Sequence, residues 1–219
     1  TGNRVILFCS DVAGAFDRVD TGRLLKKLRA RGVHEGTVKL LASWLQKRRA
    51  RVVVGGDSSN EYSLENMVFQ GTVLGPSLWN LFYGDVCKAV HKMGFREVVF
   101  ADDLNAYRVE PNTTPTKVLM DQASSCQQEI HTWGAANDVF FEATKETSHI
   151  LSRTAPEVAD CKLLGVQFDT KLIMSTEVHH LVAERSWKMY SLMRTRRFHN
   201  DLEMIFLYKS HISSYVEYR

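Results

Sequence analysis

Apolar residues in the first part of the chain predict one short strand followed by two amphipathic helices. Residues 4–10 (RVILFCS) are β-branched and apolar over a length typical of a buried strand. Leucines and a valine at helical spacing then define the buried faces of the two helices: Leu24, Leu25 and Leu28, then Val38, Leu41 and Leu45. Asp20 or Thr21 can cap the first helix, and Gly32 can end it.

The next part of the chain predicts a hairpin and then a helix. Residues 51–68 (RVVVGGDSSNEYSLENMV) indicate a hairpin in which Gly55 and Gly56 supply the positive φ values of a turn. The pattern over 75–93 predicts one long helix that begins with Gly-Pro, since proline is tolerated in the first helical turn.

The remaining pattern mixes strands and helices. Residues 95–109 indicate two strands joined at Asp102 and Asp103, and residues 114–137 predict a helix that begins at Thr-Pro. Short strands are expected after it, at 138–141, 147–152 and 162–168. From Thr176 onward the pattern is helical to the end. This succession of elements predicts the α+β fold class.

Composition is that of an ordinary globular protein. The chain has 219 residues, of which 44% are hydrophobic and 24% charged. Its longest purely apolar run is Val5–Cys9, so neither a membrane span nor a membrane partner is expected. The scattered cysteines form no C-x-x-C pair, which favours buried thiols in an intracellular, reducing compartment, nucleus or cytoplasm. Because the chain begins at Thr1, we expect it to be a piece of a longer polypeptide.

Charge is unevenly distributed, although the net charge is only +3. Residues 18–51 carry eleven Lys or Arg residues against two acids, and a second basic run covers 185–197. Residues 57–110 between them carry eight acids and four bases. Such runs are usually solvated helix faces, but they also suit a groove for a polyanion. Charge alone favours solvated helix faces.

Three aspartates are the candidate chemical centre. Asp102 and Asp103 lie between two apolar strand segments, and Asp11 ends the first predicted strand. A turn allows adjacent carboxylates to converge, whereas a straight strand points them to opposite faces. Carboxylates are preferred ligands of Mg²⁺, and a cation would relieve their mutual repulsion. Taken alone, Asp-Asp is better explained as a turn dipeptide, and the pair gains weight only together with Asp11.

Five segments of the chain resemble, in order, successive motifs of reverse transcriptases, especially those of non-LTR (LINE-like) retrotransposons. The segments are DVAGAFDRV (11–19), FQGTVLGPSLWNLFYGDV (69–86), FADDLNAY (100–107), WGAANDVFFEATKET (133–147) and KLLGVQFD (162–169). The end of the chain, residues 207–219, resembles the beginning of the thumb of that family. The resemblance therefore covers nearly the whole chain.

This resemblance implies a right-hand polymerase palm with an antiparallel sheet, packed helices, partial fingers and a partial thumb. Residues 1–19 and 70–170 would form the palm, 20–69 a fingers insertion and 171–219 the start of a helical thumb. The basic residues of 18–51 would then lie near the template, and those of 185–197 along the RNA–DNA hybrid.

The resemblance also implies a catalytic site. The metal-binding aspartates of the family match Asp11, Asp102 and Asp103, which would hold two Mg²⁺ ions, with Mn²⁺ as a possible substitute. Lys145 matches the position proposed to protonate the leaving pyrophosphate, a role that a lowered pKa would favour. A solvated turn lysine is the alternative for Lys145.

Substrate contacts follow in the same way from the matched motifs. Phe16, with the small Ala15 beside it, matches the residue that excludes a ribose 2′-hydroxyl, although an ordinary core Phe is the alternative. Gln70 and Gly71 match template and nucleotide contacts, and Gly71 would also suit a turn. A last group matches the hairpin that grips the primer end: Leu164, Gly165 and Val166.

The resemblance therefore implies an RNA-directed DNA polymerase that transfers a nucleotide from a dNTP to a primer 3′-hydroxyl and releases pyrophosphate. Expected partners are an RNA template, a DNA primer or nicked target DNA, and dNTPs. The alternative is a catalytically silent, maturase-like or domesticated protein that binds RNA through its basic faces. Because the first finger motifs of the family would precede Thr1, we expect this piece alone to polymerise weakly or not at all.

Overall fold

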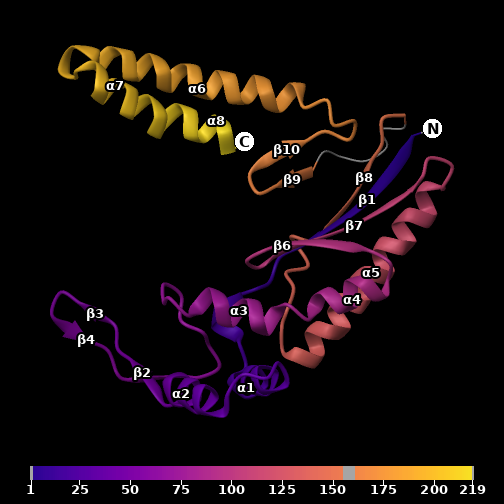
Figure 1. Ribbon diagram of the computed structural model, residues 1–219, viewed down its shortest axis with the longest axis vertical. Coiled ribbons are helices and arrows are strands. Elements are labelled where there is room, and N and C mark those ends of the chain that lie inside the picture. Colours follow the sequence, from indigo (N-terminus) through magenta and orange to yellow (C-terminus); the bar gives the residue numbers. More distant parts are fainter. Residues whose placement is uncertain (1, 155–160, 219) are drawn as a thin grey trace. The chain divides into compact units, whose positions relative to one another are not determined.

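The computed structural model describes residues 2–154 and 161–218 (Figure 1). The chain divides into two compact units. The larger is Val5–Ser148, and the smaller combines Thr1–Arg4 with His149–Arg219. A four-stranded sheet has the order β6-β7-β1-β8, from β1 (Asn3–Ser10), β6 (Arg96–Phe100), β7 (Asp103–Pro111) and β8 (Thr147–Leu151). Among the described helices, none is long and apolar enough to cross a membrane.

Strand β1 forms because its residues are apolar and buried. Ile6, Leu7 and Phe8 are each 6% exposed or less, which places them in the core. Strands β6 and β7 are an antiparallel pair whose register joins Phe100 to Asp103. This register leaves a two-residue turn at the tip of the hairpin.

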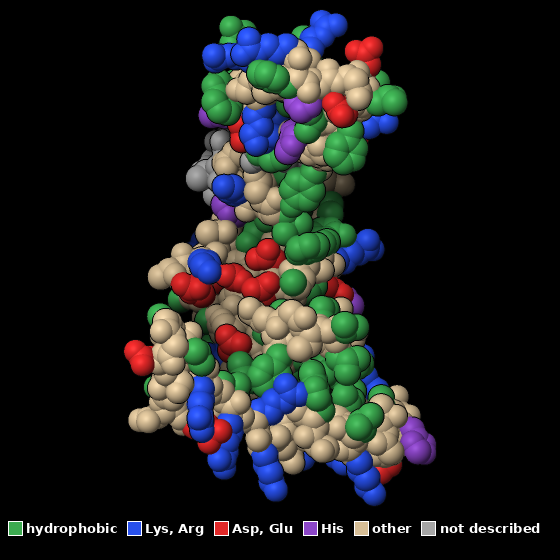
Figure 2. All heavy atoms as spheres, turned by 90° about the vertical axis from the view of Figure 1, so that its left-hand side faces the viewer, with side chains coloured by type: hydrophobic (Ala, Val, Ile, Leu, Met, Phe, Trp, Pro, Cys, Tyr) green, Lys and Arg blue, Asp and Glu red, His purple; other side chains and the backbone are tan. Residues whose placement is uncertain are grey.

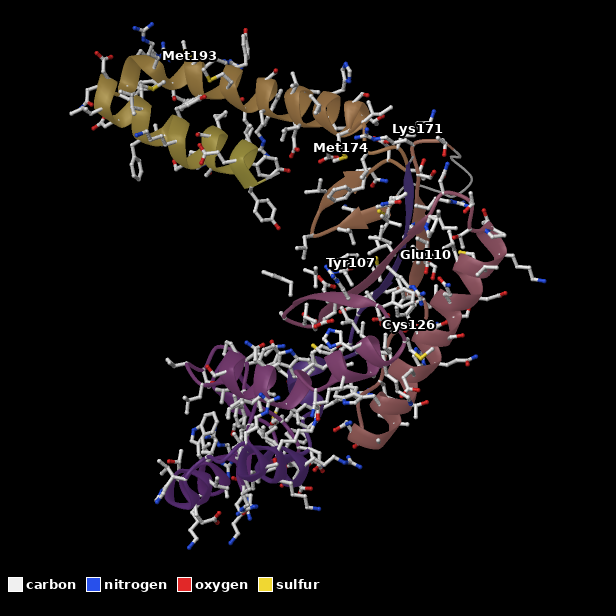
Figure 3. The ribbon with its side chains drawn as sticks, turned by 45° about the vertical axis from the view of Figure 1, so that its right-hand side comes forward. Tyr107, Glu110, Cys126, Lys171, Met174 and Met193 are labelled. Atoms are coloured by element: carbon white, nitrogen blue, oxygen red, sulfur yellow. The ribbon has the colours of Figure 1, made fainter. Side chains whose placement is uncertain are left out.

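Helices of the larger unit bury the faces that the spacing predicts. They are α1 (Thr21–Ala30), α2 (Glu35–Leu45), α3 (Gly75–Tyr83), α4 (Val86–Lys92) and α5 (Thr116–Asn137). The Asp20 carboxylate caps α1 by accepting the backbone N–H of Arg23 at 2.6 Å. Helix α1 packs on α2 and α3, and α4 packs on α5. Helix α5 contributes Cys126, which is fully buried (Figure 3).

Short elements complete the larger unit. A 3₁₀ helix, η1 (Ala15–Arg18), follows β1, and two antiparallel ribbons follow α2. The first ribbon pairs β2 (Arg48–Ala50) with β5 (Tyr62–Leu64), and the second pairs β3 (Val53–Val54) with β4 (Asp57–Ser58). The predicted hairpin is therefore confirmed, with its turn at the paired glycines.

The smaller unit contains a hairpin and a run of helices. Strands β9 (Cys161–Leu163) and β10 (Val166–Phe168) pair antiparallel. The helices are α6 (Ser175–Thr195), η2 (Arg196–Phe198), α7 (Asp201–Tyr208), the π-helical η3 (Lys209–Ser213) and α8 (Ser214–Tyr218). The loop before α6, which carries Lys171 and Met174 (Figure 3), is held by the Asp169 carboxylate. Three backbone N–H groups donate to that carboxylate and lower the pKa of Asp169.

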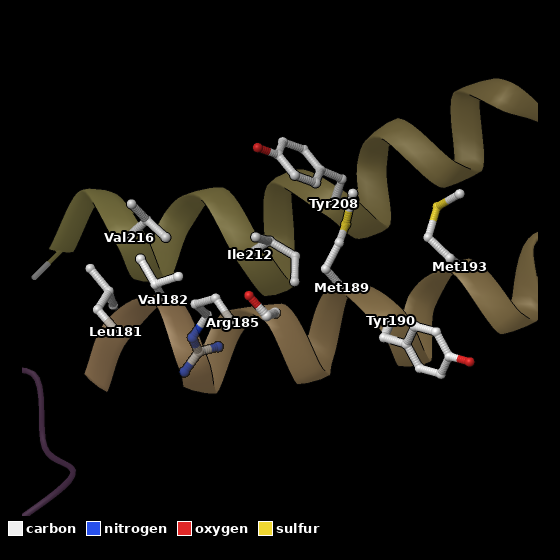
Figure 4. A pocket seen from close by; sticks show the side chains of 10 residues that line it. Leu181, Val182, Arg185, Met189, Tyr190, Met193, Tyr208, Ile212 and Val216 are labelled. Carbon is white, nitrogen blue, oxygen red and sulfur yellow. The ribbon is translucent and has the colours of Figure 1, made fainter. Parts of the chain in front are cut away.

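Helix α6 and the final helices enclose an apolar groove (Figure 4). Its lining includes Met189, Met193, Tyr208, Ile212 and Val216. Arg185 also lines this groove and is only 7% exposed, because its guanidinium donates to the His211 carbonyl and lies 3.1 Å from the centroid of the Tyr215 ring.

Three expectations of the sequence were wrong in detail. The helix predicted over 75–93 is two helices, because Asp85 between them turns its carboxylate to Lys27 and Trp133. No strand forms at 138–141, where only a single bridge joins Phe141 to Val12. Arg185, which was placed on a nucleic-acid face, is instead buried in the smaller unit.

Candidate active site

Asp11 follows the last residue of β1, and a second segment of chain runs beside it. The Asp11 carbonyl accepts the backbone N–H of Glu142 at 3.0 Å, and the Ala13 N–H donates to the Phe140 carbonyl at 2.9 Å. These backbone bonds fix residues 140–142 against the exit from the strand. The Asp11 side chain remains 21% exposed, so its carboxylate can meet a ligand.

The β6–β7 hairpin presents the other two aspartates. Its turn residues are Ala101 and Asp102, while Asp103 is the first residue of β7. The predicted junction is thus confirmed but shifted by one residue. Ala101 has a φ of 55°, which is unusual for a residue other than glycine. Such strained turns are typical of functional hairpins.

Strands β1 and β7 are neighbours in the sheet, and the charges of Asp11 and Asp102 act on Asp103. The pKa of Asp103 is raised, first by burial and then by the negative charges of Asp11 and Asp102. Both causes disfavour the ionised carboxylate, and the smaller of them, repulsion by Asp11 and Asp102, would be relieved by a bound cation. The sequence prediction that β1 and the hairpin bring Asp11 near the Asp-Asp pair is consistent with this interaction.

Lys145 lies against this cluster. Its ammonium contacts the Asp11 carboxylate at 2.7 Å and the Glu142 carboxylate at 2.9 Å. Hydrogen bonds to both partners raise the pKa of Lys145. This direction is opposite to the one expected for an acid that readily gives up its proton. While it is paired with Asp11, Lys145 therefore acts as a counterion.

The carboxylate oxygens of the three aspartates are chemically suited to a divalent cation, although the side chains are not already arranged around a metal site. Oxygen-only carboxylates that repel one another are the ligand type that Mg²⁺ and Mn²⁺ accept. Within the described residues, no group of three or more His, Cys, Asp or Glu side chains is already arranged to hold a metal ion. Lys145 supplies positive charge at Asp11 in this arrangement.

The predicted gate and template residues gather around η1 and the loop before α3. Ala15 is buried and Phe16 half-buried, and the Phe16 ring lies 5.6 Å from the Trp79 ring. The Phe16 carbonyl accepts the N–H of Val68 at 2.8 Å, which fixes that loop to η1. Gln70 and Gly71 follow on the same loop, both exposed.

Gly71 has a φ of 78°, and a Cβ built there would meet nothing within 4 Å. The turn interpretation of this glycine is thus confirmed by its backbone. Its exposure leaves the backbone accessible to a ligand.

The predicted primer-grip residues belong to the smaller unit. Leu164 and Gly165 form the turn between β9 and β10, with φ values of 47° and 86°, and Val166 begins β10. The Tyr218 hydroxyl donates to the Leu164 carbonyl at 3.1 Å and ties the turn to the last helix.

Basic residues of the 18–51 segment divide into two sets. Several already have partners in the fold: Lys27 pairs with Asp85, Arg29 with Glu35, and Arg49 with Glu61. Others are exposed and have no ion pair in the part of the chain that the structure describes: Lys26, Lys39, Lys47 and Arg51. Figure 2 shows Lys and Arg side chains spread at the lower end of the larger unit and Asp and Glu side chains gathered above them.

Two residues with a direct link to this site were missed by the sequence analysis. Glu146, next to Lys145, has a side chain only 4% exposed and accepts hydrogen bonds from Ser10 at 3.0 Å and Gln127 at 2.6 Å. Trp79 donates its indole N–H to the Ala101 carbonyl at 2.7 Å. Only their places within the matched motifs could have singled them out, because their partners are distant in sequence.

Comparison with known sequences confirms the resemblance. The family model described as "Reverse transcriptase (RNA-dependent DNA polymerase)" matches residues 1–168. A curated relative is the retrovirus-related Pol polyprotein from type-1 retrotransposable element R2 of Popillia japonica. It is 34% identical over 71 residues, which are 32% of this chain and 12% of that protein.

Solved structures confirm the expected α+β polymerase fold. Apo telomerase from Candida tropicalis, truncated from its C-terminal domain, matches with a TM-score of 0.58 at 12% identity, over 76% of this chain and 34% of that chain. Telomerase from Candida albicans, in complex with a TWJ fragment of telomeric RNA, matches with a TM-score of 0.57 at 14% identity, over 77% and 30%. The chain thus spans about a third of these structures.

Proposed function

The chain belongs to the reverse transcriptase (RNA-dependent DNA polymerase) family, and on that premise we propose that it carries the nucleotidyl-transfer centre of an RNA-directed DNA polymerase of a non-LTR retroelement. The observation that supports this most directly is that β1, which ends next to Asp11, is the sheet neighbour of β7, which begins at Asp103, so that the charge of Asp11 acts on Asp103. Families of this kind use divalent metal ions, and these three carboxylates suit them.

The three aspartates would hold two Mg²⁺ ions, for which Mn²⁺ could substitute. When bound, the ions would activate the attacking primer 3′-hydroxyl and stabilise the leaving oxygen of the dNTP. Asp11 supplies one carboxylate from the end of β1, and the hairpin supplies the others. Burial and the negative charges of Asp11 and Asp102 raise the pKa of Asp103, and a bound cation would favour its ionised carboxylate against both effects.

Lys145 would change partner during the reaction. In the structure its ammonium neutralises Asp11. A cation on Asp11 would weaken that ion pair, and the exposed ammonium could then hold and donate a proton at the pyrophosphate oxygen. The raised pKa caused by Asp11 would fall as that pairing weakens.

Within the larger unit, the loop beside η1 would make substrate contacts. Phe16, with Ala15 next to it, would lie under the sugar of the incoming dNTP. Gln70 and Gly71 would contact the template and nucleotide, because both are exposed on a loop fixed to η1. The turn formed by residues 164–166 would hold the primer end. Residues 1–19 and 70–170 would be the palm, 20–69 the fingers insertion and 171–219 the thumb.

An RNA template and a DNA primer or nicked target DNA would bind the exposed basic side chains. Such contacts address phosphates and are largely independent of sequence. One of the solved telomerases is itself described in complex with a fragment of telomeric RNA. The unpaired cations of the 18–51 segment are the corresponding candidates here.

The test is primer extension on a primed RNA template, with dNTPs and Mg²⁺, by this chain within its longer polypeptide. We expect Asp102→Ala to reduce extension by a factor of about 10³ or more, because it removes a ligand of the reacting centre. Asp57→Ala is the matched control, since Asp57 is an exposed aspartate of the β3–β4 ribbon.

Equal extension by the Asp102→Ala variant would refute the site. RNA binding without extension under Mg²⁺ or Mn²⁺, unaffected by Asp102→Ala, would instead support the catalytically silent RNA-binding protein.

A further inference from the structure

Trp79 is a buried side chain that contacts two separate parts of the candidate site. It lies on α3 and is 1% exposed. Its indole N–H donates to the Ala101 carbonyl at 2.7 Å. On the other side, its ring lies 5.6 Å from the Phe16 ring, and it stacks on Tyr83 at 4.8 Å.

The Ala101 carbonyl that accepts this hydrogen bond lies in the turn of the β6–β7 hairpin. It belongs to the peptide that joins Ala101 to Asp102, so its direction sets the direction of the backbone that carries the Asp102 carboxylate. Ala101 is exposed and has a φ of 55°, a conformation that residues other than glycine adopt at an energetic cost. A strained turn persists only where the surrounding structure fixes it.

The indole is rigid enough to provide that constraint. It is enclosed by aromatic rings from η1 and from its own helix, and its N–H has the Ala101 carbonyl as its partner. A buried N–H left without an acceptor would be destabilising, so the hydrogen bond favours the turn geometry seen here. The same ring supports Phe16, the proposed sugar gate.

We propose that Trp79 is a positioning residue that couples the metal-binding turn to the sugar gate. This inference rests on the proposed function, because it concerns the placement of Asp102 as a ligand. The Trp79–Ala101 hydrogen bond fixes the backbone of the turn that carries Asp102, from which the carboxylate can turn toward a divalent cation. Ring contact with Phe16 makes the position of the gate depend on the same side chain.

Replacement of tryptophan by phenylalanine separates these contributions. Trp79→Phe keeps an aromatic ring in the core but removes the N–H donor. Trp133→Phe is the matched control, because Trp133 also donates its indole N–H, to Asp85 at 3.1 Å, and also contacts Tyr83. Both variants lose one indole hydrogen bond, but only the first loses the bond to the Asp102 turn.

Mn²⁺ binding measured by electron paramagnetic resonance of the free ion provides a readout other than activity. We expect Trp79→Phe to bind Mn²⁺ about three- to tenfold more weakly than the wild type, as suits the loss of one hydrogen bond. The Trp133→Phe variant should bind within twofold of the wild type. In primer extension, Trp79→Phe should also raise the ratio of rNTP to dNTP incorporation.

Ala101→Gly tests the mechanism of the coupling. Glycine adopts a positive φ without strain, so the turn would no longer need the indole. The double variant Trp79→Phe/Ala101→Gly should therefore regain at least half of the lost Mn²⁺ affinity. A purely structural role of Trp79 in the core predicts no such recovery.

Each result has a defined meaning. If the wild type binds no Mn²⁺, the proposed metal site fails. If it binds and Trp79→Phe binds equally well with unchanged sugar discrimination, the inference about Trp79 is overturned while the proposed function stands. Weakening by Trp133→Phe to the same extent would also overturn it.

Hydrogen exchange decides the question if Trp79→Phe does not fold. If the indole hydrogen bond favours metal binding, metal binding must favour the hydrogen bond to the same extent. Mg²⁺ should therefore slow the exchange of the Trp79 indole N–H in the wild type, observed by nuclear magnetic resonance. Unchanged exchange at a saturating Mg²⁺ concentration would overturn the proposal.

Discussion

Replacement of Gly75 by alanine should destabilise the protein, although Gly75 begins a helix. A Cβ at this position would lie 2.9 Å from the Phe69 carbonyl oxygen and 3.1 Å from the Thr72 hydroxyl. That carbonyl cannot easily move away, because it accepts both the hydroxyl of Thr72 at 2.7 Å and its backbone N–H. An ordinary contact begins at 3.4 Å, so the loop or helix must shift by about half an ångström.

The expected magnitude follows from two opposing effects. Overpacking against fixed atoms costs about 1–3 kcal/mol, while the better helix propensity of alanine returns up to about 1 kcal/mol. The net loss of about 1–2 kcal/mol corresponds to a decrease in Tm of roughly 2–8 °C for a chain of this size. Because the loop carries Gln70 and Gly71, the KM for dNTP in primer extension should rise as well.

Circular dichroism during thermal unfolding measures the stability change, and Gly22→Ala is the control. Gly22 lies near the start of α1, where a Cβ would meet only the Asp20 carboxylate, at an ordinary 3.4 Å. This variant should gain up to about 1 kcal/mol and raise the Tm slightly. The same chemical change thus has opposite signs at the two sites. A Tm for Gly75→Ala equal to or above that of the wild type would refute the argument.

Two further predictions concern buried charge. Lys27→Met removes an ammonium that bonds to Asp85 at 2.8 Å. Because the pair is partly exposed, we expect the free energy of unfolding in urea to fall by only about 1–3 kcal/mol. A second change, Asp85→Asn, should restore part of the loss, and a loss below about 0.5 kcal/mol for Lys27→Met would contradict this expectation. Asp103→Asn should abolish primer extension yet raise the Tm at pH 7. The pKa of Asp103 is raised in the fold, so the ionised carboxylate destabilises the fold above its unfolded pKa, and the gain should vanish as the pH falls below about 3.9. A lower Tm at pH 7 would contradict the expectation that burial and neighbouring charges make ionised Asp103 unfavourable in the fold.

Local patterns predicted most of the elements because local physics determines them. The apolar run of β1 and the spacing of Leu24 and Leu28 specify a strand and a helix face. The helix predicted over 75–93 divides for a reason that spacing does not contain. Asp85 has a tertiary role with Lys27 and Trp133, and neither partner is near it in sequence.

In the candidate site, too, features set by local patterns were predicted and features set by distant contacts were not. Its aspartates were predicted because β1 and the hairpin each have a recognisable pattern, and the family resemblance joined them. The roles of Trp79 and Glu146 were not predicted, because each acts through a hydrogen bond to a residue far away in the chain. The raised pKa of Lys145 was also unexpected, since it arises from an ion pair with Asp11 across 134 residues.

The candidate site carries more negative than positive charge. The Lys145 ammonium pairs with the carboxylates of Asp11 and Glu142, and the carboxylate of Asp103 interacts with those of Asp11 and Asp102. One positive charge cannot neutralise these four carboxylates, so the proposed site would attract further cations. A cation that binds Asp11 competes with the ammonium, and metal binding and release of Lys145 are then coupled by linkage. Under the proposed function, Lys145 would thus serve as the counterion of Asp11 while the two are paired and would be available as a proton donor when they are not.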